Sequence, residues 1–437
     1  MPSKVKTYSE AFVWIWLPGE TEPVIAGKLT PEGDRLVFNY GQSYLDRPNK
    51  IAIYDRELPL QTGLLPLLDT LTMPGCIRDA SPDAWGRRVL INKKFGAKRG
   101  AIDEIQLDEL TYLLESGSDR IGALDFQLSP TNYQPRFATN VTLEELLAAA
   151  ESVEKGVPLT PELDLALHHG SPIGGARPKA LIEADNKKYI AKFSSSSDVY
   201  SVIKAEFISM RLAELSGINV APVMLRKASH KDVLLVERFD RMRTRNGWHR
   251  KSMVSALTLF ELDEMMARYA SYEELAEIIR HKFRSASLTL KELFQRLTFN
   301  ILVGNTDDHA RNHAAFWDGQ MLSLTPAYDI CPQQRSGTVA TQAMLISGTD
   351  NKSQIETCLS ASANFLLSRQ QALSLIENQV NKIVENWESV CDLAEVSAVD
   401  RKLFANRQFL NPYAFDNVGE DAVYLLDLVR AFRASLN

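Results

Sequence analysis

The sequence predicts an α+β fold in which a small mixed α/β domain precedes a β-rich part and a helical part. The chain has 437 residues, more than the roughly 250–300 at which a single hydrophobic core stops growing. Turn-bounded, β-favouring runs are frequent in its first half, whereas helical periodicity dominates the second. We therefore expect three domains, at residues 1–140, 141–240 and 241–437.

The composition is that of a folded globular protein. Hydrophobic residues make up 45% of the chain and charged residues 24%, which is unlike disordered or collagen-like chains. The net charge of -6 gives no overall attraction to nucleic acid or to an anionic membrane. The apolar run at residues 11–17 is too short for a signal or a membrane span. Four scattered cysteines lack metal-site spacing, so we expect reduced thiols and a cytoplasmic location.

The first domain begins with three short β-favouring runs, at residues 12–17, 36–39 and 51–54. Pro-Gly, Glu-Gly-Asp and Asp-Arg-Pro-Asn separate them, and these are residues typical of turns. This pattern predicts a small antiparallel sheet, after which the spacing of apolar residues becomes helical.

Capping boxes mark three expected helix starts further along the chain. In each, a Ser or Thr precedes a Glu by three residues: Thr142 with Glu145, Ser271 with Glu274, and Thr289 with Glu292. Between the first two boxes, strands are expected at residues 179–184, 189–193 and 232–239, with a helix at 201–216 that ends at Gly217. The stretch after residue 354 is expected to be mostly helical.

A polar cluster at residues 304–313 follows an apolar helical face that begins at Leu290. Phosphoryl transfer needs a carboxylate that orients the attacking hydroxyl, together with oxygen ligands for Mg²⁺. Asp307 and Asn312 have the five-residue separation of these groups in protein kinases, and Asp329 follows a β-hairpin signal as the second metal-binding Asp does. The spacing predicts one catalytic and two metal-binding residues.

Groups suited to phosphate binding lie upstream. Residues 170–179 form a glycine-rich stretch before a strand, which includes Gly174, Gly175 and Ala176. Lys192 lies in the otherwise apolar strand Tyr-Ile-Ala-Lys-Phe, where an unpaired ammonium would be costly. A phosphate is a natural partner for this lysine; snorkelling or pairing with a surface carboxylate is the alternative.

Four motifs in a fixed order resemble the HipA family of serine/threonine protein kinase toxins. They are Gly-Gly-Ala-Arg-Pro-Lys at 174–179, Val-Glu-Arg-Phe-Asp-Arg at 236–241, Asn-Thr-Asp-Asp-His-Ala-Arg-Asn at 305–312 and Pro-Ala-Tyr-Asp at 326–329. The segment Asp-Ala-Ser-Pro-Asp-Ala-Trp-Gly-Arg-Arg from residue 79 also resembles the N-terminal part of that family. The resemblance implies a bilobed, protein-kinase-like fold that uses ATP and Mg²⁺.

The resemblance also implies residue roles. Asp307 would be the catalytic Asp, Asn312 and Asp329 the Mg²⁺ ligands, and Lys192 the lysine on the ATP phosphates. Glu237 and Phe239 would form the adenine-binding hinge. Ser171 is the candidate for the autophosphorylated serine of the family, although it lies one position before the expected place, which Pro172 occupies.

Partners are implied by the resemblance alone. Members of the family phosphorylate aminoacyl-tRNA synthetases, so a translation component is the expected protein substrate. They usually pair with a small helix-turn-helix antitoxin, through which DNA would be contacted only indirectly. No membrane partner is expected.

Several alternatives stay open. Asp307 and Asn312 could cap a helix or close a turn, as we expect of Asp308. His309 and His313 could suggest zinc, but no third ligand is evident, so His309 is interpreted as a brace for the loop. The basic run at residues 241–251 is interpreted as a solvated loop. The same cleft could transfer a nucleotidyl group, or the chain could be a non-catalytic module acting through its antitoxin.

Overall fold

The computed structural model describes residues 8–68, 70–95, 107–137, 141–157, 159, 175–334 and 337–436. The chain divides into two compact units. Unit 1 comprises residues 1–197, 226–254 and 316–320, and unit 2 comprises residues 198–225, 255–315 and 321–437. Ser171 and Gly174 lie outside the described residues. None of the helices in the described ranges is long and apolar enough to cross a membrane.

Unit 1 begins with an antiparallel sheet in the order β3-β2-β1-β4. Its strands are β1 (Ala11–Ile15), β2 (Val24–Glu32), β3 (Arg35–Tyr40) and β4 (Leu124–Gln127). The expected strands at residues 12–17 and 36–39 are thus confirmed, and β2 is a strand that the sequence analysis did not identify. The helices of this part are α1 (Gln42–Leu45), α2 (Gly75–Arg78), α3 (Ala84–Phe95), α5 (Glu109–Glu115) and α6 (Leu143–Lys155).

The expected strand at residues 51–54 is wrong, because side chains rather than another strand satisfy this backbone. The Tyr44 hydroxyl donates to Ile51 O at 2.7 Å, and Ile53 N donates to the Tyr40 hydroxyl at 2.9 Å. The indole nitrogen of Trp317 donates to Ala52 O at 2.9 Å. Buried backbone groups need partners of some kind, and here buried aromatic residues supply them.

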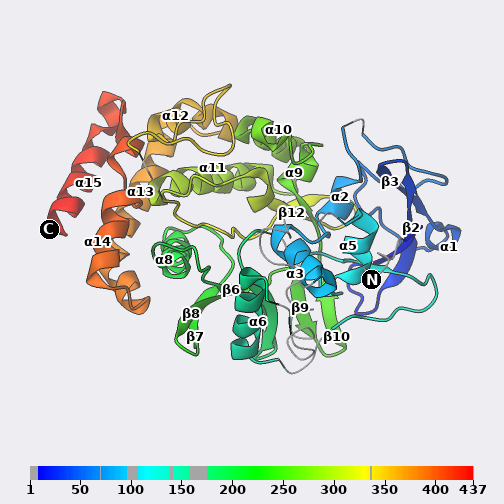
Figure 1. Cartoon of the computed structure of the whole chain (residues 1–437). Coiled ribbons are helices and arrows are strands. Elements are labelled where there is room, and N and C mark those ends of the chain that lie inside the picture. The colour runs from blue at the N-terminus through cyan, green and yellow to red at the C-terminus, as the bar shows by residue number, and fades with distance from the viewer. Residues whose placement is uncertain are drawn as a thin grey trace. The chain divides into compact units, whose positions relative to one another are not determined.

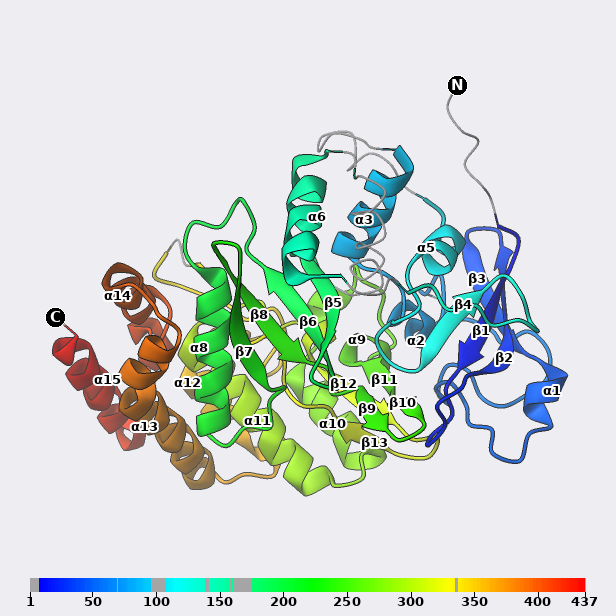
Figure 2. The ribbon, with the colours of Figure 1, turned by 90° about the horizontal axis from the view of Figure 1, so that it is seen from below.

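A second antiparallel sheet has the order β5-β6-β8-β7. It consists of β5 (Lys179–Ala184), β6 (Lys187–Phe193), β8 (Lys231–Glu237) and β7 (Val223–Ala228), which lie side by side in Figure 2. Helix α6 packs on β5 and also contacts α3. These strands confirm the β-rich stretch that the sequence predicts. A hairpin of β9 (Arg241–Thr244) and β10 (Gly247–Arg250) follows, and then β11 (Ser252–Ser255).

Unit 2 is mainly helical, and α11 is its most buried helix. Its helices are α8 (Val202–Leu215), α9 (Ala256–Leu259), α10 (Tyr272–Lys282), α11 (Ala286–Val303), α12 (Ile355–Ser360), α13 (Arg369–Leu393), α14 (Ala398–Arg407) and α15 (Val423–Ser435). Helix α11 contacts α10, α12 and α13 (Figure 1). The short strands β12 (Ala314–Trp317) and β13 (Leu322–Leu324) flank the Asp318-Gly319 turn.

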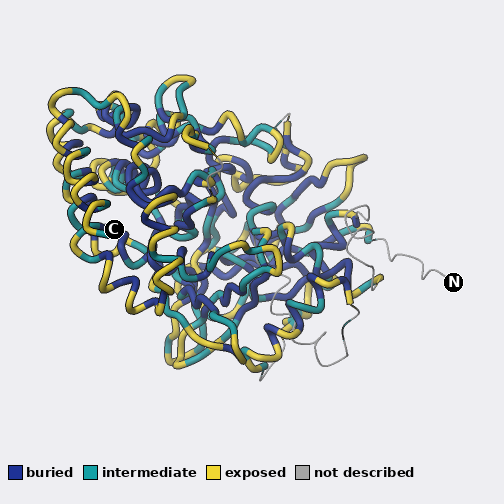
Figure 3. The backbone as a smooth tube through the Cα atoms, turned by 60° about the vertical axis from the view of Figure 1, so that its left-hand side comes forward, coloured by how far each residue is buried: buried dark blue, intermediate teal, exposed yellow. Residues whose placement is uncertain are grey.

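Amphipathic helices complete unit 2 towards the C-terminus. Helix α13 packs on α8, α11 and α15, and its buried residues recur at helical spacing, as Ile376, Val380, Ile383 and Trp387 show. Buried and exposed stretches alternate along these helices near the end of the chain (Figure 3). The helical C-terminal part that the sequence predicts is confirmed.

Two of the three capping boxes mark helix starts correctly. Thr142 and Glu145 form a reciprocal capping box on α6, and the Ser271 side chain accepts from Glu274 N at the start of α10. The third is wrong, because α11 begins at Ala286 and Thr289 N already donates to Ser285 O at 2.9 Å. The apolar face that includes Leu290 therefore belongs to a helix that starts three residues before the expected cap.

Candidate functional site

The end of α11 fixes where the polar loop of unit 2 begins. Gly304 has a φ of 72° and closes the helix by donating to Asn300 O and Ile301 O. A Cβ at this position would lie 2.8 Å from Gln408 O, so only glycine fits. Gln333 N donates to Gly304 O at 3.0 Å. Conformation and close packing thus both hold the first residue of the loop.

The loop joins Asp307 to Asn312 through hydrogen bonds. Asn312 Nδ2 donates to Asp307 O at 3.2 Å, and His309 N donates to the same oxygen at 2.9 Å. Asn312 N in turn donates to His309 O at 2.8 Å. The side-chain bond uses the amide nitrogen of Asn312 and does not consume the oxygen, which is the atom that can bind a hard cation.

Asp329 lies next to this loop in a strained conformation. Its φ of 60° is in the left-handed region, which non-glycine residues rarely adopt and which is often found at functional sites. Asn305 Nδ2 approaches Asp329 O at 3.5 Å. Ala327, two residues before Asp329, is hydrogen-bonded through both backbone groups: its N–H donates to Asn219 O at 2.8 Å, and its carbonyl accepts from Ala221 N at 2.9 Å. The surrounding chain therefore holds Asp329 in place.

The electrostatics of the loop favour a bound cation. Asp307 is exposed, but partial desolvation by neighbouring groups, followed by the negative charges of Asp329 and Asp308, raises its pKa, against the opposing effect of His309. In the described part of the chain no cluster of three or more His, Cys, Asp or Glu residues could hold a metal by itself. A divalent cation here would therefore need the Asn312 oxygen and oxygens of a bound ligand as well, as is usual for Mg²⁺.

Beneath the loop, a buried network holds Asp308. Its Oδ2 accepts from Asn300 Nδ2 at 2.8 Å, from His313 Nε2 at 3.1 Å and from the Tyr272 hydroxyl. All four residues are buried. Burial alone would raise the pKa of Asp308, but the charge of His313 and the hydrogen bonds from His313 and Tyr272 hold it below its usual value.

This network corrects two interpretations made from sequence. Asp308 is not a helix cap but the acceptor at the centre of the network. The histidine of this network is His313 rather than His309, since the Nε2 atom of His313 contacts Asp308 Oδ2 at 3.1 Å. Asn300, on α11, and Tyr272, on α10, were not identified from the sequence. A buried Asn on an otherwise apolar helical face, eight residues before an Asp, was the signal available for Asn300.

Unit 1 holds the residues expected to bind phosphate. Lys192 on β6 is buried and pairs directly with Lys179 on β5. Directly opposed residues of an antiparallel pair share a face of the sheet, and like charges in that position are unfavourable. The sequence analysis did not assign a role to Lys179, although its place at the start of a strand behind the glycine-rich stretch indicated one.

The described end of the glycine-rich stretch approaches Lys179. Gly175 has a φ of 91°, and a Cβ on it would clash with Nζ of Lys179. Gly175 N donates to Asp83 Oδ2 at 2.8 Å, and Gly175 O accepts from Trp85 N at 3.0 Å. Ala176 follows directly. The N-terminal segment around Trp85 thus supports this end of the loop.

The residues expected at the adenine hinge lie at the end of β8. Glu237 is half-buried and forms an ion pair with Lys187 at 2.6 Å. Phe239 is half-buried and packs edge-on against Phe316, with ring centroids 5.9 Å apart. The role of both residues stays a prediction. The structure thus groups the site residues into two sets: Asp307, Asn312 and Asp329 in unit 2, and Gly175, Ala176, Lys192, Glu237 and Phe239 in unit 1.

The basic run at residues 241–251 is not simply a solvated loop. It forms the β9–β10 hairpin, in which Arg241 and Arg250 are buried, each 7% exposed. Arg241 donates to Asp119 and Asp240, two carboxylates that Arg238 also contacts. The residues between them, Arg243 and Arg245, are exposed as expected. The pairing partner Asp119 lies about 120 residues upstream, so local sequence could not indicate it.

Two family models match this chain. Residues 16–127 match the model of the HipA N-terminal domain, and residues 171–387 match that of the HipA-like C-terminal domain. The kinase-named protein Y4mE of Sinorhizobium fredii is 29% identical over 351 residues, which are 72% of this chain and 76% of that protein.

Two comparisons involve Shewanella oneidensis. Its serine/threonine-protein kinase toxin HipA is 25% identical over 182 residues, which are 36% of this chain and 42% of that protein. The solved structure of HipA with HipB and operator DNA from this organism matches with a TM-score of 0.62 at 18% identity, covering 97% of this chain and 95% of that one. This likeness shows the kinase-like fold. The chain belongs to the HipA-type family of kinase-like proteins.

Proposed function

We propose that this protein is an ATP- and Mg²⁺-dependent serine/threonine protein kinase of the HipA toxin type. The arrangement of Asp307, Asn312 and Asp329 carries the proposal. These residues have the order of the protein-kinase catalytic and metal-binding groups, they lie on one loop and the strained segment beside it, and the charges of Asp329 and Asp308 act on Asp307.

Each residue has a stated role in the proposal. Asp307 orients the hydroxyl of the substrate and accepts its proton. Asn312 Oδ1 and the Asp329 carboxylate hold Mg²⁺, which would neutralise charge on the ATP phosphates. Gly174, Gly175 and Ala176 present backbone groups to the phosphates, and Lys192 supplies a positive charge. Glu237 and Phe239 bind the adenine.

The partners follow from family membership. The S. oneidensis HipA structure contains HipB and operator DNA, so we propose that a helix-turn-helix antitoxin binds this chain and that DNA is contacted only through it. We propose a protein substrate, with an aminoacyl-tRNA synthetase or another translation component as the first class to examine. The proposed location is the cytoplasm. Ser171 is the proposed site of autophosphorylation.

Incubation of the purified protein with γ-labelled ATP and Mg²⁺ tests the proposal, with α-labelled ATP in parallel. Transfer of the γ label alone to a protein serine or threonine, lost in Asp307→Asn, is expected. Transfer of the α label would indicate nucleotidyl transfer instead. Neither label, together with no ATP binding by calorimetry, would overturn the kinase proposal in favour of a module that acts through its antitoxin. Mass mapping of the labelled chain tests Ser171.

A further inference from the structure

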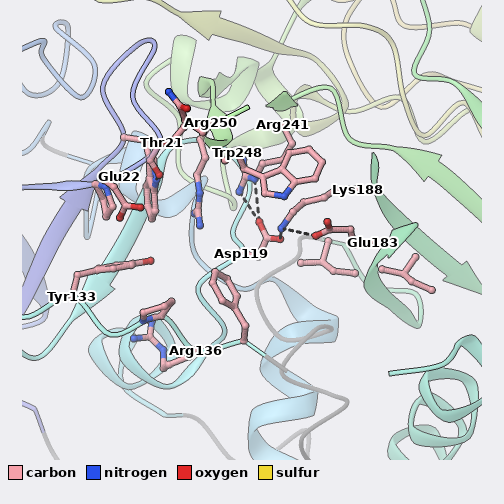
Figure 4. A pocket seen from close by; sticks show the side chains of 18 of the residues that line it. Thr21, Glu22, Asp119, Tyr133, Arg136, Glu183, Lys188, Arg241, Trp248 and Arg250 are labelled. Atoms are coloured by element: carbon pink, nitrogen blue, oxygen red, sulfur yellow. Dashed lines mark hydrogen bonds and ion pairs between the residues drawn. The ribbon is translucent and has the colours of Figure 1, made fainter. Parts of the chain in front are cut away.

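Unit 1 contains a pocket whose lining includes none of the residues proposed to bind nucleotide. Its volume is about 760 Å³, within the range of sites for small organic ligands. Loop residues Thr21 and Glu22, the segment from Tyr133 to Phe137, strand β5 and the β9–β10 hairpin surround it (Figure 4). Gly175, Lys192, Glu237 and Phe239 are not among its lining residues. The pocket therefore needs an explanation of its own.

The floor of the pocket is a cluster of paired charges, in which three cations contact two carboxylates. Asp119 accepts from Arg241 Nη2 at 2.9 Å, from Arg238 Nη1 at 3.1 Å and from Lys188 Nζ at 2.5 Å. Asp240 accepts from Arg238 Nη2 at 2.8 Å, from Arg241 Nη1 at 2.9 Å and from the backbone N–H of Gly122 at 2.8 Å. Figure 4 shows the bonds from Asp119 to Arg241 and Lys188. The carboxylates in this part of the pocket are therefore held in place and already have their hydrogen-bond and ion-pair partners.

Arg250 differs from the cations of the floor. It is 7% exposed, and its guanidinium lies 3.4 Å above the ring of Trp16. Its Nη1 donates to the backbone oxygen of Ser118 at 2.9 Å, whereas no carboxylate among the described residues pairs with it. Figure 4 shows its guanidinium pointing towards the middle of the pocket. A buried, stacked guanidinium with remaining donors is well suited to bind a carboxylate or phosphate.

Aromatic rings surround this charge. Trp16, Tyr133, Phe137 and Trp248 line the pocket, and Tyr133 meets Trp16 edge-on at 5.6 Å between centroids. Leu181 and Ile182 of β5 add apolar surface. The lining includes the cations Arg136, Lys188, Arg241 and Arg250 but only the carboxylates Glu22, Asp119 and Glu183. The balance is one positive charge, combined with rings that can hold a flat apolar body.

We propose that this pocket binds a small organic anion with an aromatic or other flat apolar body. Arg250 binds the anionic group, because the other arginines of the lining, Arg136 and Arg241, are already paired with Asp125 and with Asp119 and Asp240. The side chains of Trp16, Tyr133 and Phe137 contact the body. The volume fits a single small molecule of about nucleotide size. This inference does not depend on the proposed kinase activity, because it uses none of the residues assigned to ATP, Mg²⁺ or catalysis.

Calorimetric titration with 1-naphthyl phosphate tests the proposal, with the neutral 1-naphthol as the matched ligand and with Mg²⁺-ATP present in excess. We expect saturable binding of the phosphate with one site per chain, at least about tenfold weaker binding of 1-naphthol, and no displacement by ATP. No saturable binding, equal binding of the neutral compound, or displacement by ATP would each overturn the proposal.

Variants locate the site. Arg250→Met should weaken binding about tenfold or more, whereas the control Arg245→Met removes an exposed arginine in the turn of the same hairpin that does not line the pocket and should leave binding unchanged. If Arg250→Met does not fold by circular dichroism, Val141→Trp serves instead, because it fills the pocket from its half-buried lining without removing a charge. Unchanged binding in the folded variant would overturn the proposal.

Discussion

The charge cluster of unit 1 and the loop of unit 2 use carboxylates in opposite ways. In unit 1, Asp240 is buried and Asp119 is half-buried, and each faces two arginines, so these positive and negative charges cancel. In unit 2, Asp307 is exposed and lies within the influence of two further carboxylates, Asp308 and Asp329. The first arrangement is complete without a ligand. The second is electrostatically unfavourable until a cation binds, as is expected of the proposed catalytic site.

The adjacent residues Asp307 and Asp308 show the same contrast within one loop. The pKa of Asp307 is raised by partial desolvation and negative neighbours, whereas that of Asp308 is lowered by His313 against the effect of burial. The chain thus places a carboxylate that is kept ionised and fixed directly beside one that can exchange a proton. The fixed residue positions the other.

The largest effect is expected from Asp307→Asn. Transfer of the γ-phosphoryl group should fall about 10²- to 10⁴-fold, because general-base groups contribute in this range, while the midpoint of thermal unfolding should not fall, since the change removes like-charge repulsion. Label transfer and a thermal melt measure the two quantities. Asp427→Asn, on the exposed face of α15, is the control. A parallel loss of activity and stability would contradict a catalytic role.

Arg238→Met should have the largest effect on stability. Arg238 is 4% exposed and contacts both Asp119 and Asp240, so its loss leaves buried negative charge with a single arginine partner. Removing one member of such a cluster typically costs about 3–5 kcal/mol. Urea unfolding monitored by circular dichroism measures this loss. Arg243→Met, at an exposed position of β9, should change the free energy of unfolding by less than about 0.5 kcal/mol; equal effects would show that the cluster does not stabilise unit 1.

The contrast between the regions also explains what the sequence could predict. The loop residues Asp307 and Asn312 are five positions apart, and this spacing can be recognised in the sequence without knowledge of the fold. The cluster joins Asp119 to Arg238 and Arg241 across more than a hundred residues, so Arg241 and Arg250 were interpreted as parts of a solvated loop. The strand expected at residues 51–54 failed for a similar reason, because its partners are the side chains of Tyr40, Tyr44 and Trp317.

Acid should affect the two regions differently. The pKa of Asp240 is lowered to about 2: burial opposes this shift, and the charges of Arg238 and Arg241 cause it. A carboxyl whose pKa is lower in the folded state stabilises the protein at any pH above its unfolded-state pKa, which is near 4. This contribution is lost as the pH falls from about 4 towards 2. Urea unfolding of the wild type should therefore show a loss of about 2–3 kcal/mol over this window. Arg238→Met should show a smaller dependence on pH, and an equal slope would contradict the assignment.

A smaller effect is expected from Tyr272→Phe. The change removes one of three hydrogen bonds to Asp308 Oδ2 and leaves those from Asn300 and His313. The free energy of unfolding should fall by about 1–2 kcal/mol. If the network positions the catalytic loop, kcat should fall while KM for ATP stays unchanged. Tyr269→Phe, at an exposed position, is the control; a change in KM alone would indicate an effect on nucleotide binding instead.

The smallest effect is expected in the pH dependence of kcat/KM, which tests whether a cation offsets the negative charge around Asp307. Because partial desolvation and, after it, the charges of Asp329 and Asp308 raise the pKa of Asp307, kcat/KM should decrease as the pH falls through that raised value, since the protonated carboxyl cannot accept the proton of the substrate. Mg²⁺ bound beside Asp329 would counter the negative charge and lower this pKa. The acid limb of the profile should therefore move to lower pH, by about one unit, when subsaturating Mg²⁺ is raised to saturation. A limb that does not move would mean that the cation binds too far from Asp307 to complete the charge balance, and the metal site would then have to be sought away from Asp329.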